Sequence, residues 1–356
     1  MRLQNISLEN FRNYKKISIA IDADLVLILG PNAAGKTNFL ESIYFLSRLK
    51  SFRAPDNLLV KNQEDFFSLT GLYGARKLEA ILQTVPVLKR QFKLDDLKTK
   101  RGFWQPFPVV LFVPNDLNLF HLGPILRRKY LDETLSQTDQ AYSMDLESLD
   151  HVLKQKSALL EQIYTAGAGP EQTEQLDFWN QQLAPIAFRI TNTRQKFIDF
   201  LNLKIQGKIQ DLTGFNDSYL VEYKRTEASS EAAILEYLEV HKQAEIRSGK
   251  NLVGPHRDDF EIKKNNEPNL YSSSRGELRA QILALKLLQA EYLSEAGKKP
   301  IILLDDVFSE LDEVRRAKLI ENLSGHQIFI TSTEERHLPR VSEGALVLKV
   351  ENNTIK

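Results

Sequence analysis

The sequence predicts an α/β fold with a central mixed sheet, an antiparallel β subdomain and a short helical-hairpin arm. One observation is an apolar run at 25–29 that precedes a predicted helix. A second is an apolar run at 301–304 that ends in two aspartates, and a third is a pair of helical apolar stripes between 146 and 201. The run at 25–29 leads directly into Gly30, Pro31, Asn32, Ala33, Ala34, Gly35, Lys36 and Thr37.

Strands dominate the first 113 residues. Residues 2–8 and 17–21 alternate apolar and polar side chains with period two, as half-buried antiparallel strands do. The runs 69–73, 78–84 and 91–94 predict a meander with a turn at Gly74. The only helix that we expect here follows the glycine-containing loop.

That loop has the G-x-x-x-x-G-K-[ST] spacing of a phosphate-binding loop between a strand and a helix. Backbone N–H groups of such a turn and of the helix N-terminus bind phosphate oxygens. Lys36 would reach the β and γ phosphates, and the Thr37 hydroxyl would hold Mg²⁺. We expect Asn38 to contact the nucleotide as well. The motif predicts binding of a nucleoside triphosphate.

Two helices with regularly spaced apolar residues occupy the middle of the chain. A break at 165–170 separates them, and Pro185 predicts a kink in the second limb. At 1.5 Å per residue each limb reaches about 30–50 Å, so the hairpin is a short arm. The two stripes consist of Leu146, Leu149, Leu153 and Leu160, then Leu176, Trp179, Leu183, Ile186, Ile190, Phe197 and Leu201.

The run 301–304 followed by Asp305 and Asp306 has the form of a Walker B strand. Ligands of α/β sheets bind at the carboxyl edge, where these carboxylates would lie. Asp305 is placed to hold Mg²⁺ and Asp306 to act as the general base that polarises water. An ordinary buried strand that ends in Asp is the structural alternative.

Composition indicates a cytosolic globular protein. The chain has 356 residues, and 47 Lys and Arg balance 47 Asp and Glu, so nucleic-acid contacts would need a local basic patch. It has no cysteine, which fits a reducing compartment. No apolar run approaches the roughly 20 residues of a membrane helix.

Two strings around Walker B give the order of motifs found in ABC ATPases. Ser273-Ser274-Arg275-Gly276-Glu277 opens a helix upstream, and Ser309-Glu310-Leu311-Asp312 follows Walker B. Ser274 and Gly276 match the signature motif and Asp312 the D-loop, although Ser274 and Glu277 also form a plain capping box. The resemblance implies a homodimer in which Ser274 of one copy completes the γ-phosphate site at Lys36 of the other.

Five further strings resemble the RecF family of bacterial DNA replication and repair proteins across essentially the whole chain. They are residues 8–14, 51–53, 110–117, 127–132 and 254–259. The resemblance implies an ABC-type P-loop ATPase head, with residues 1–117 and 216–356 as its two parts and 118–215 as the arm. It implies a weak, DNA-dependent ATPase that dimerises when it binds ATP with Mg²⁺. The dimer would bind double-stranded and gapped DNA and, with RecR and RecO, load RecA. ATP hydrolysis would then reset the dimer.

By position in that family, Arg12 and Asn13 would lie near the adenosine and phosphates, and Asn115 or Asp116 near the Q-loop. The structural alternatives are a solvated charge for Arg12 and a plain turn after Pro114. Two departures stand out: Glu277 replaces the more usual glutamine, and Thr331-Ser332-Thr333 occupies the place of the ABC histidine. A hydroxyl there can bond the γ-phosphate but carries no proton, which favours slow turnover.

Clusters of basic residues are the candidate DNA contacts, and the first two rank higher because they flank the expected head face. Residues 127–129 are ambiguous, because they also fit a brace at the base of the arm. The clusters are Arg48, Lys50 and Arg53; Lys89, Arg90 and Lys93; and Lys98, Lys100 and Arg101.

Two other classes of protein remain open. One is a transporter-energising subunit, which the short arm disfavours. The other is an ATP-dependent nuclease of the overcoming-lysogenization type, for which no nuclease domain is expected after Ile330.

Overall fold

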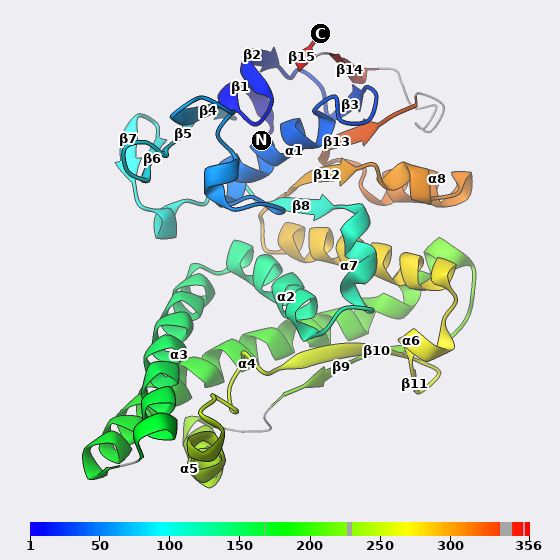
Figure 1. Cartoon of the computed structure of the whole chain (residues 1–356). Helices are drawn as coiled ribbons and strands as arrows, with labels where there is room; N and C mark the ends of the chain where they lie inside the picture. Colours follow the sequence, from blue (N-terminus) through cyan, green and yellow to red (C-terminus); the bar gives the residue numbers. More distant parts are fainter. Residues whose placement is uncertain (168, 226–229, 335–343, 352) are drawn as a thin grey trace. The chain divides into compact units, whose positions relative to one another are not determined.

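A computed structural model describes residues 1–167, 169–225, 230–334, 344–351 and 353–356 (Figure 1). The chain forms two compact units, each described by itself below. The first unit comprises Met1–Asp116, Asp211–Thr213 and Leu283–Lys356. The second comprises Leu117–Gln210 and Gly214–Ile282. Residues 216–282, which the sequence assigns to the head, therefore belong to the second unit together with most of the helical arm. The predicted division into functional domains stays a prediction.

The first unit contains the predicted antiparallel meander. Its six strands run in the order β2-β1-β4-β5-β6-β7, and every neighbouring pair is antiparallel. Alternate residues face the core, as in β5, where Leu78, Ala80 and Leu82 are buried. The strands are β1 (Leu3–Phe11), β2 (Tyr14–Ala20), β4 (Phe66–Tyr73), β5 (Arg76–Gln83), β6 (Lys89–Leu94) and β7 (Leu97–Thr99).

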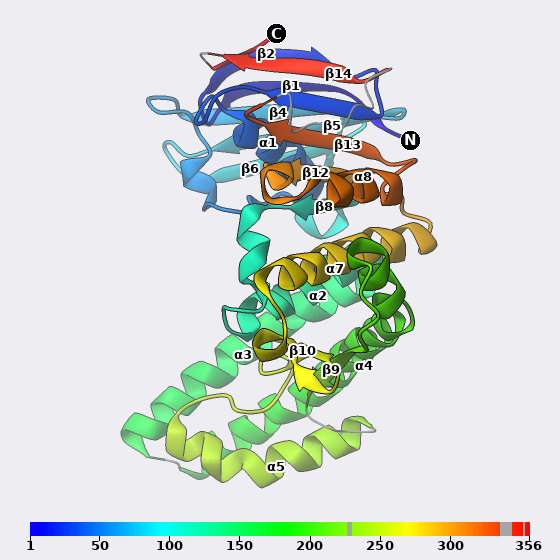
Figure 2. The ribbon, with the colours of Figure 1, turned by 90° about the vertical axis from the view of Figure 1, so that its right-hand side faces the viewer.

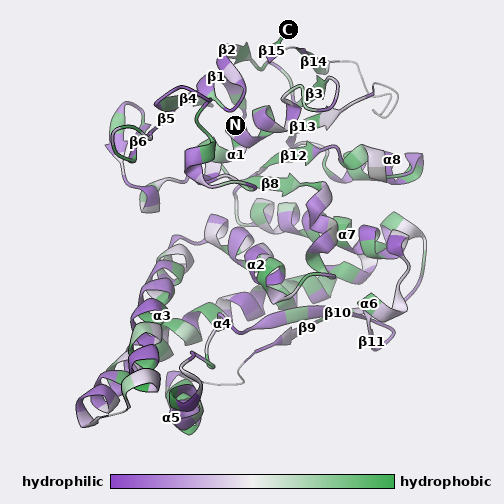
Figure 3. Cartoon of the chain, viewed as in Figure 1, coloured by the Kyte–Doolittle hydropathy of each residue, from purple (hydrophilic) through white to green (hydrophobic). Residues whose placement is uncertain are grey.

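A second, mixed sheet in the same unit carries both nucleotide motifs. Its order is β15-β14-β3-β13-β12-β8, and all pairs are parallel except β14 with β15. Strands β3, β8, β12 and β13 are buried along almost their whole length, as parallel strands covered on both faces are, and β8 and β12 are hydrophobic in Figure 3. The strands are β3 (Leu25–Leu29), β8 (Val109–Phe112), β12 (Ile301–Asp305), β13 (Gln327–Ser332), β14 (Leu346–Glu351) and β15 (Thr354–Ile355).

Helix α1 (Lys36–Arg48) packs against strands of both sheets, including β1, β4, β12 and β13 (Figure 2). Phe39, Leu40 and Ile43 are fully buried there. The C-terminal part of α7 (Arg275–Glu295) and α8 (Glu313–Asn322) complete the unit. This packing fixes the helix that begins at the phosphate loop.

The second unit confirms the helical hairpin and adds elements that the sequence did not predict. Both stripes lie on helices, and Pro185 lies inside a helix that continues past it. A further helix, α5, buries Ile234 and Leu238, and it packs against α3. The elements are α2 (Pro124–Thr138), α3 (Gln140–Ala166), α4 (Pro170–Thr213), β9 (Tyr219–Lys224), α5 (Glu231–Ser248), β10 (Asp259–Lys264), β11 (Glu267–Pro268) and α6 (Asn269–Ser272). Ala168, in the predicted break, lies outside the described residues.

A buried arginine joins two of the family strings in this unit. Arg194, 1% exposed, donates to Asp132 at 2.9 Å, to Asp258 at 3.3 Å and to the Pro255 carbonyl at 2.7 Å. Arg127 pairs with Asp259 at 2.6 Å. Residues 127–132 and 254–259 are thus bound to one another, and Arg127 acts as a structural brace. Among the described residues, no helix has the length and hydropathy of a membrane span.

Candidate nucleotide site

The phosphate loop joins β3 to α1 and needs both of its glycines. At Gly30 an added Cβ would lie 2.4 Å from the Val350 carbonyl oxygen. Gly35 has a φ of 117°, and a Cβ there would lie 2.5 Å from Asn13 Nδ2. The backbone contact at Gly30 and the left-handed φ at Gly35 both favour glycine, which explains the two fixed positions of the motif.

Lys36, the first residue of α1, directs its ammonium group back over this loop. Its Nζ donates to the carbonyl oxygens of Gly30 at 2.7 Å and Pro31 at 2.9 Å. Burial lowers the pKa of Lys36, and the charges of Asp306 and Asp305 oppose that shift. The loop and the end of β12 therefore bring one cation and two carboxylates to the same edge of the sheet. Asn32 on the loop is exposed, and Ala33 adopts a left-handed conformation with a φ of 63°.

The two motifs meet through hydroxyl groups. Thr37 Oγ1 donates to Asp305 Oδ1 at 2.9 Å, and Thr331 Oγ1 donates to the same oxygen at 2.8 Å. Asp306 follows in a left-handed conformation with a φ of 52°. A hydroxyl beside a carboxylate is a hard-oxygen donor set that fits Mg²⁺, which takes one or two protein ligands and keeps water and phosphate oxygens.

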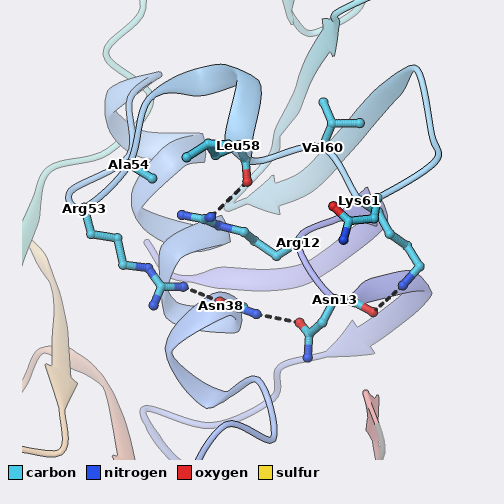
Figure 4. Close-up of a pocket in the computed structure, with 9 residues that line it drawn as sticks. Arg12, Asn13, Asn38, Arg53, Ala54, Leu58, Val60 and Lys61 are labelled. Carbon is cyan, nitrogen blue, oxygen red and sulfur yellow. Dashed lines mark hydrogen bonds between the residues drawn. The ribbon is translucent and has the colours of Figure 1, made fainter.

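A pocket of about 620 Å³ opens beside α1 (Figure 4). A chain of amides crosses it: Asn38 Nδ2 donates to Asn13 Oδ1 at 2.6 Å, and Asn13 Nδ2 donates to the Ala34 carbonyl at 3.2 Å. Arg53 donates to Asn38 Oδ1. The pocket thus shares its wall with the phosphate loop. Its lining is Arg12, Asn13, Asn38, Arg53, Ala54, Leu58, Val60, Lys61 and Asn62.

Glu41 binds the two arginines that line the pocket, and the sequence does not predict this role. This fully buried carboxylate accepts from Arg12 Nε and NH2, both at 2.8 Å, and from Arg53 NH2 at 2.9 Å. Burial alone would raise the pKa of Glu41, but hydrogen bonds from Arg12, Arg53 and Ser51 bring it below its ordinary value. Arg12 also donates to the Leu58 carbonyl at 2.8 Å. No sequence pattern links position 41 with 12 and 53, which lie on different elements.

Ser274 and Gly276, predicted as the signature, lie in the second unit, at the start of α7. The Ser274 N–H donates to Glu277 Oε2 at 2.8 Å and the Glu277 N–H donates to Ser274 Oγ at 3.3 Å, so the capping box is present. Lys264 pairs with Glu277 and, at 3.3 Å, with Asp217. Burial would raise the pKa of Glu277, but the bonds from Lys264 and Ser274 lower it to about 2.

The remaining predicted residues lie in the first unit. Asp312 caps α8 by accepting from the Arg315 N–H at 2.8 Å. Asp116 accepts from the Val113 N–H at 2.8 Å and pairs with Lys286 at 3.1 Å, so its carboxylate supports the turn after β8. The structure thus brings together Walker A, Walker B, Arg12, Asn13 and Asn38 in one unit, with Ser274 and Gly276 in the other.

A phosphate loop and a Walker B strand on a mixed sheet, beside an antiparallel sheet, define an ABC-type ATPase head. Residues 1–78 match the model of a family described as AAA ATPase domain. An Smc head bound to the C-winged helix domain of ScpA shares the fold, with a TM-score of 0.57 at 13% identity over 100% of this chain and 96% of that one.

Two closer relatives identify the family. The DNA replication and repair protein RecF of Moorella thermoacetica is 36% identical over 344 residues, 95% of this chain and 92% of that protein. A structure described as the recombination mediator protein RecF-ATPrS in the RecFOR pathway has a TM-score of 0.91 and 32% identity, and covers 99% of this chain and 97% of its own. The chain belongs to the RecF family.

Proposed function

We propose that this chain is an ATP-dependent DNA-binding protein of recombinational repair in the cytoplasm. An ATP-driven homodimer binds double-stranded and gapped DNA and, with RecR and RecO, helps to load RecA at single-strand gaps. Slow ATP hydrolysis then resets it. The observation that carries the proposal is the bond between Thr37 and Asp305, which joins Walker A to Walker B in a member of the RecF family.

The nucleotide proposal assigns a role to each contact. Backbone N–H groups of the loop residues 32–35 and the Lys36 ammonium bind the phosphates, since a helix N-terminus favours anions. Thr37 and Asp305 hold Mg²⁺, which supplies charge stabilisation for phosphoryl transfer. Asp306 orients the attacking water. The pocket lined by Arg12, Asn13 and Asn38 takes the adenosine, because it adjoins the loop at Ala34.

The dimer proposal follows from the separation of the motifs between the two units. One chain has one phosphate loop and one signature serine, and in the ABC arrangement these meet only across a head-to-tail pair. The γ-phosphate then bridges two copies, with Ser274 and Gly276 of one chain facing Lys36 of the other. Loss of the γ-phosphate removes that bridge and releases the pair.

Light scattering with and without ATP tests this proposal. The wild-type chain should double its mass with ATP, and Ser274→Arg should stay monomeric because the larger cation blocks the serine's place. Ser148→Arg is the matched control, since Ser148 is an exposed serine on α3 of the same unit. An ATP-induced dimer of Ser274→Arg would refute the assignment of the signature.

The ion pairs of the described residues change the ranking of the three basic clusters as candidate DNA contacts. Arg53 binds Glu41, Arg90 pairs with Asp56 at 2.8 Å, and Lys93 pairs with Glu79 at 2.8 Å. Within the described ranges no ion pair involves Lys89 or the third cluster, which is exposed around the edge strand β7. We therefore place the strongest phosphate contacts at Lys98, Lys100 and Arg101.

A further inference from the structure

Thr331 lies near the carboxyl end of β13, between β3, which precedes the phosphate loop, and β12, which ends in the Walker B aspartate. It is the β13 residue paired with Asp305 of β12, and it is fully buried. Its hydroxyl donates to Asp305 Oδ1 at 2.8 Å and accepts from the Asp306 N–H at 2.9 Å. A hydroxyl offers one donor and two acceptor lone pairs, so both bonds form at once.

We propose that Thr331 is a positioning residue for the Asp305 carboxylate and for the backbone turn at Asp306. The bond to Asp305 fixes the oxygen that also accepts from Thr37. The bond from the Asp306 N–H stabilises the left-handed turn in which the chain leaves β12. One side chain therefore sets the direction of the metal ligand and of the residue that follows it.

This role differs from the one that the sequence position suggested. The sequence predicts that a hydroxyl among residues 331–333 can bond the γ-phosphate; of these, the Thr331 hydroxyl binds the Asp305 carboxylate and the Asp306 N–H. The neighbouring Ser332 hydroxyl donates to the Glu334 carbonyl at 2.9 Å. Thr331 thus acts on the metal site through Asp305, as residues behind metal ligands do.

The chemistry of the side chain makes the proposal specific to a hydroxyl. Valine has the same shape, so Thr331→Val would keep the packing of β13 but leave the Asp306 N–H without its acceptor. Of the hydrogen bonds that described residues make to the Asp305 carboxylate, the one from Thr37 would then remain, and the carboxylate could rotate. Serine restores both bonds with one methyl group fewer. The inference rests on the proposed Mg²⁺–ATP site.

The test is the Mg²⁺ dependence of binding of a fluorescent ATP analogue, measured alongside steady-state hydrolysis. In Thr331→Val we expect the half-saturating Mg²⁺ concentration to rise roughly 10- to 100-fold, with binding in EDTA unchanged. Thr331→Ser should remain near the wild-type value. The matched control is Thr134→Val, which removes another fully buried hydroxyl, bonded to the Tyr130 carbonyl at 2.8 Å.

A wild-type Mg²⁺ midpoint in Thr331→Val, or an equal rise in Thr331→Val and Thr331→Ser, overturns the proposal. Should Thr331→Val fail to fold, Thr331→Ser and Thr331→Ala form a second pair that differs only in the hydroxyl. A higher midpoint for alanine supports the role, and equal midpoints overturn it. Failure of the wild-type chain to bind the analogue would instead refute the nucleotide site itself.

Discussion

Replacing Glu41 with glutamine tests whether its ion pairs hold the wall of the pocket that we propose for adenosine. The carboxylate is fully buried and accepts three bonds from the guanidinium groups of Arg12 and Arg53, at 2.8–2.9 Å. Glutamine keeps one acceptor oxygen and places an amide donor against guanidinium donors. It therefore loses up to two charge-assisted hydrogen bonds.

The expected cost follows from the exposure of the partners. Two bonds to a charged group contribute about 3–6 kcal/mol when the partners stay buried. The side chain of Arg12 is 17% exposed and that of Arg53 38%, so both regain some hydration. We therefore expect Glu41→Gln to lower the free energy of unfolding by about 2–4 kcal/mol, with weaker ATP binding because Arg12 and Arg53 line the pocket.

Urea unfolding measures the first effect, and titration with a fluorescent ATP analogue the second. Glu79→Gln is the control: Glu79 pairs with Lys93 at 2.8 Å on the antiparallel sheet, and its loss should cost no more than about 1 kcal/mol. Because the folded-state pKa of Glu41 is lowered, its stabilisation is present above about pH 4.3 and is lost as pH falls through the folded pKa. Equal effects of the two substitutions at pH 7 would refute the reasoning.

Three further predictions concern other parts of the chain. Alanine at Lys98, Lys100 and Arg101 should weaken DNA binding and reduce the slope of log affinity against log salt by roughly 2–3, measured by fluorescence anisotropy; an unchanged slope places the contacts elsewhere. Lys156→Met should lower the free energy of urea unfolding by about 3–5 kcal/mol, because it leaves the buried Glu245 without its cation 2.6 Å away. Adding Glu245→Gln should recover much of that stability, and no recovery argues against the ion pair. Glu277→Gln should tighten the ATP-driven dimer, measured by light scattering, because Glu277 places a negative charge beside Ser274; a weaker dimer contradicts this.

The sequence predicted those parts of the fold that depend on local pattern. The glycine spacing and the apolar run before it predicted a phosphate loop between a strand and a helix, and the loop does join β3 to α1. This pattern is readable in the sequence because the structure favours glycine at positions 30 and 35. Period-two alternation gave the meander, and the apolar stripes gave α3 and α4. Each of these signals lies within one segment of the chain.

The contacts that the sequence did not predict join positions far apart. Glu41 receives Arg12 from the turn after β1 and Arg53 from the loop after α1. Thr331 meets Asp305 only because β12 and β13 are neighbours in register. The sequence did not predict helix α5, because its buried face includes the charged residues Lys242 and Glu245. Their shortest ion pairs are to Asp177 and Lys156, which lie on other helices. Such pairings depend on topology, which one sequence does not display.

Mixing two inactive variants tests most directly whether each ATP site is built by two copies of this chain. Lys36→Ala removes the lysine that we propose binds the phosphates, and Ser274→Arg removes the serine that we propose completes the partner's site. A mixed dimer would hold one site with both groups intact, so ATP hydrolysis should reappear on mixing. If hydrolysis stays absent in the mixture, or if Ser274→Arg alone hydrolyses ATP at the wild-type rate, the composite site is contradicted.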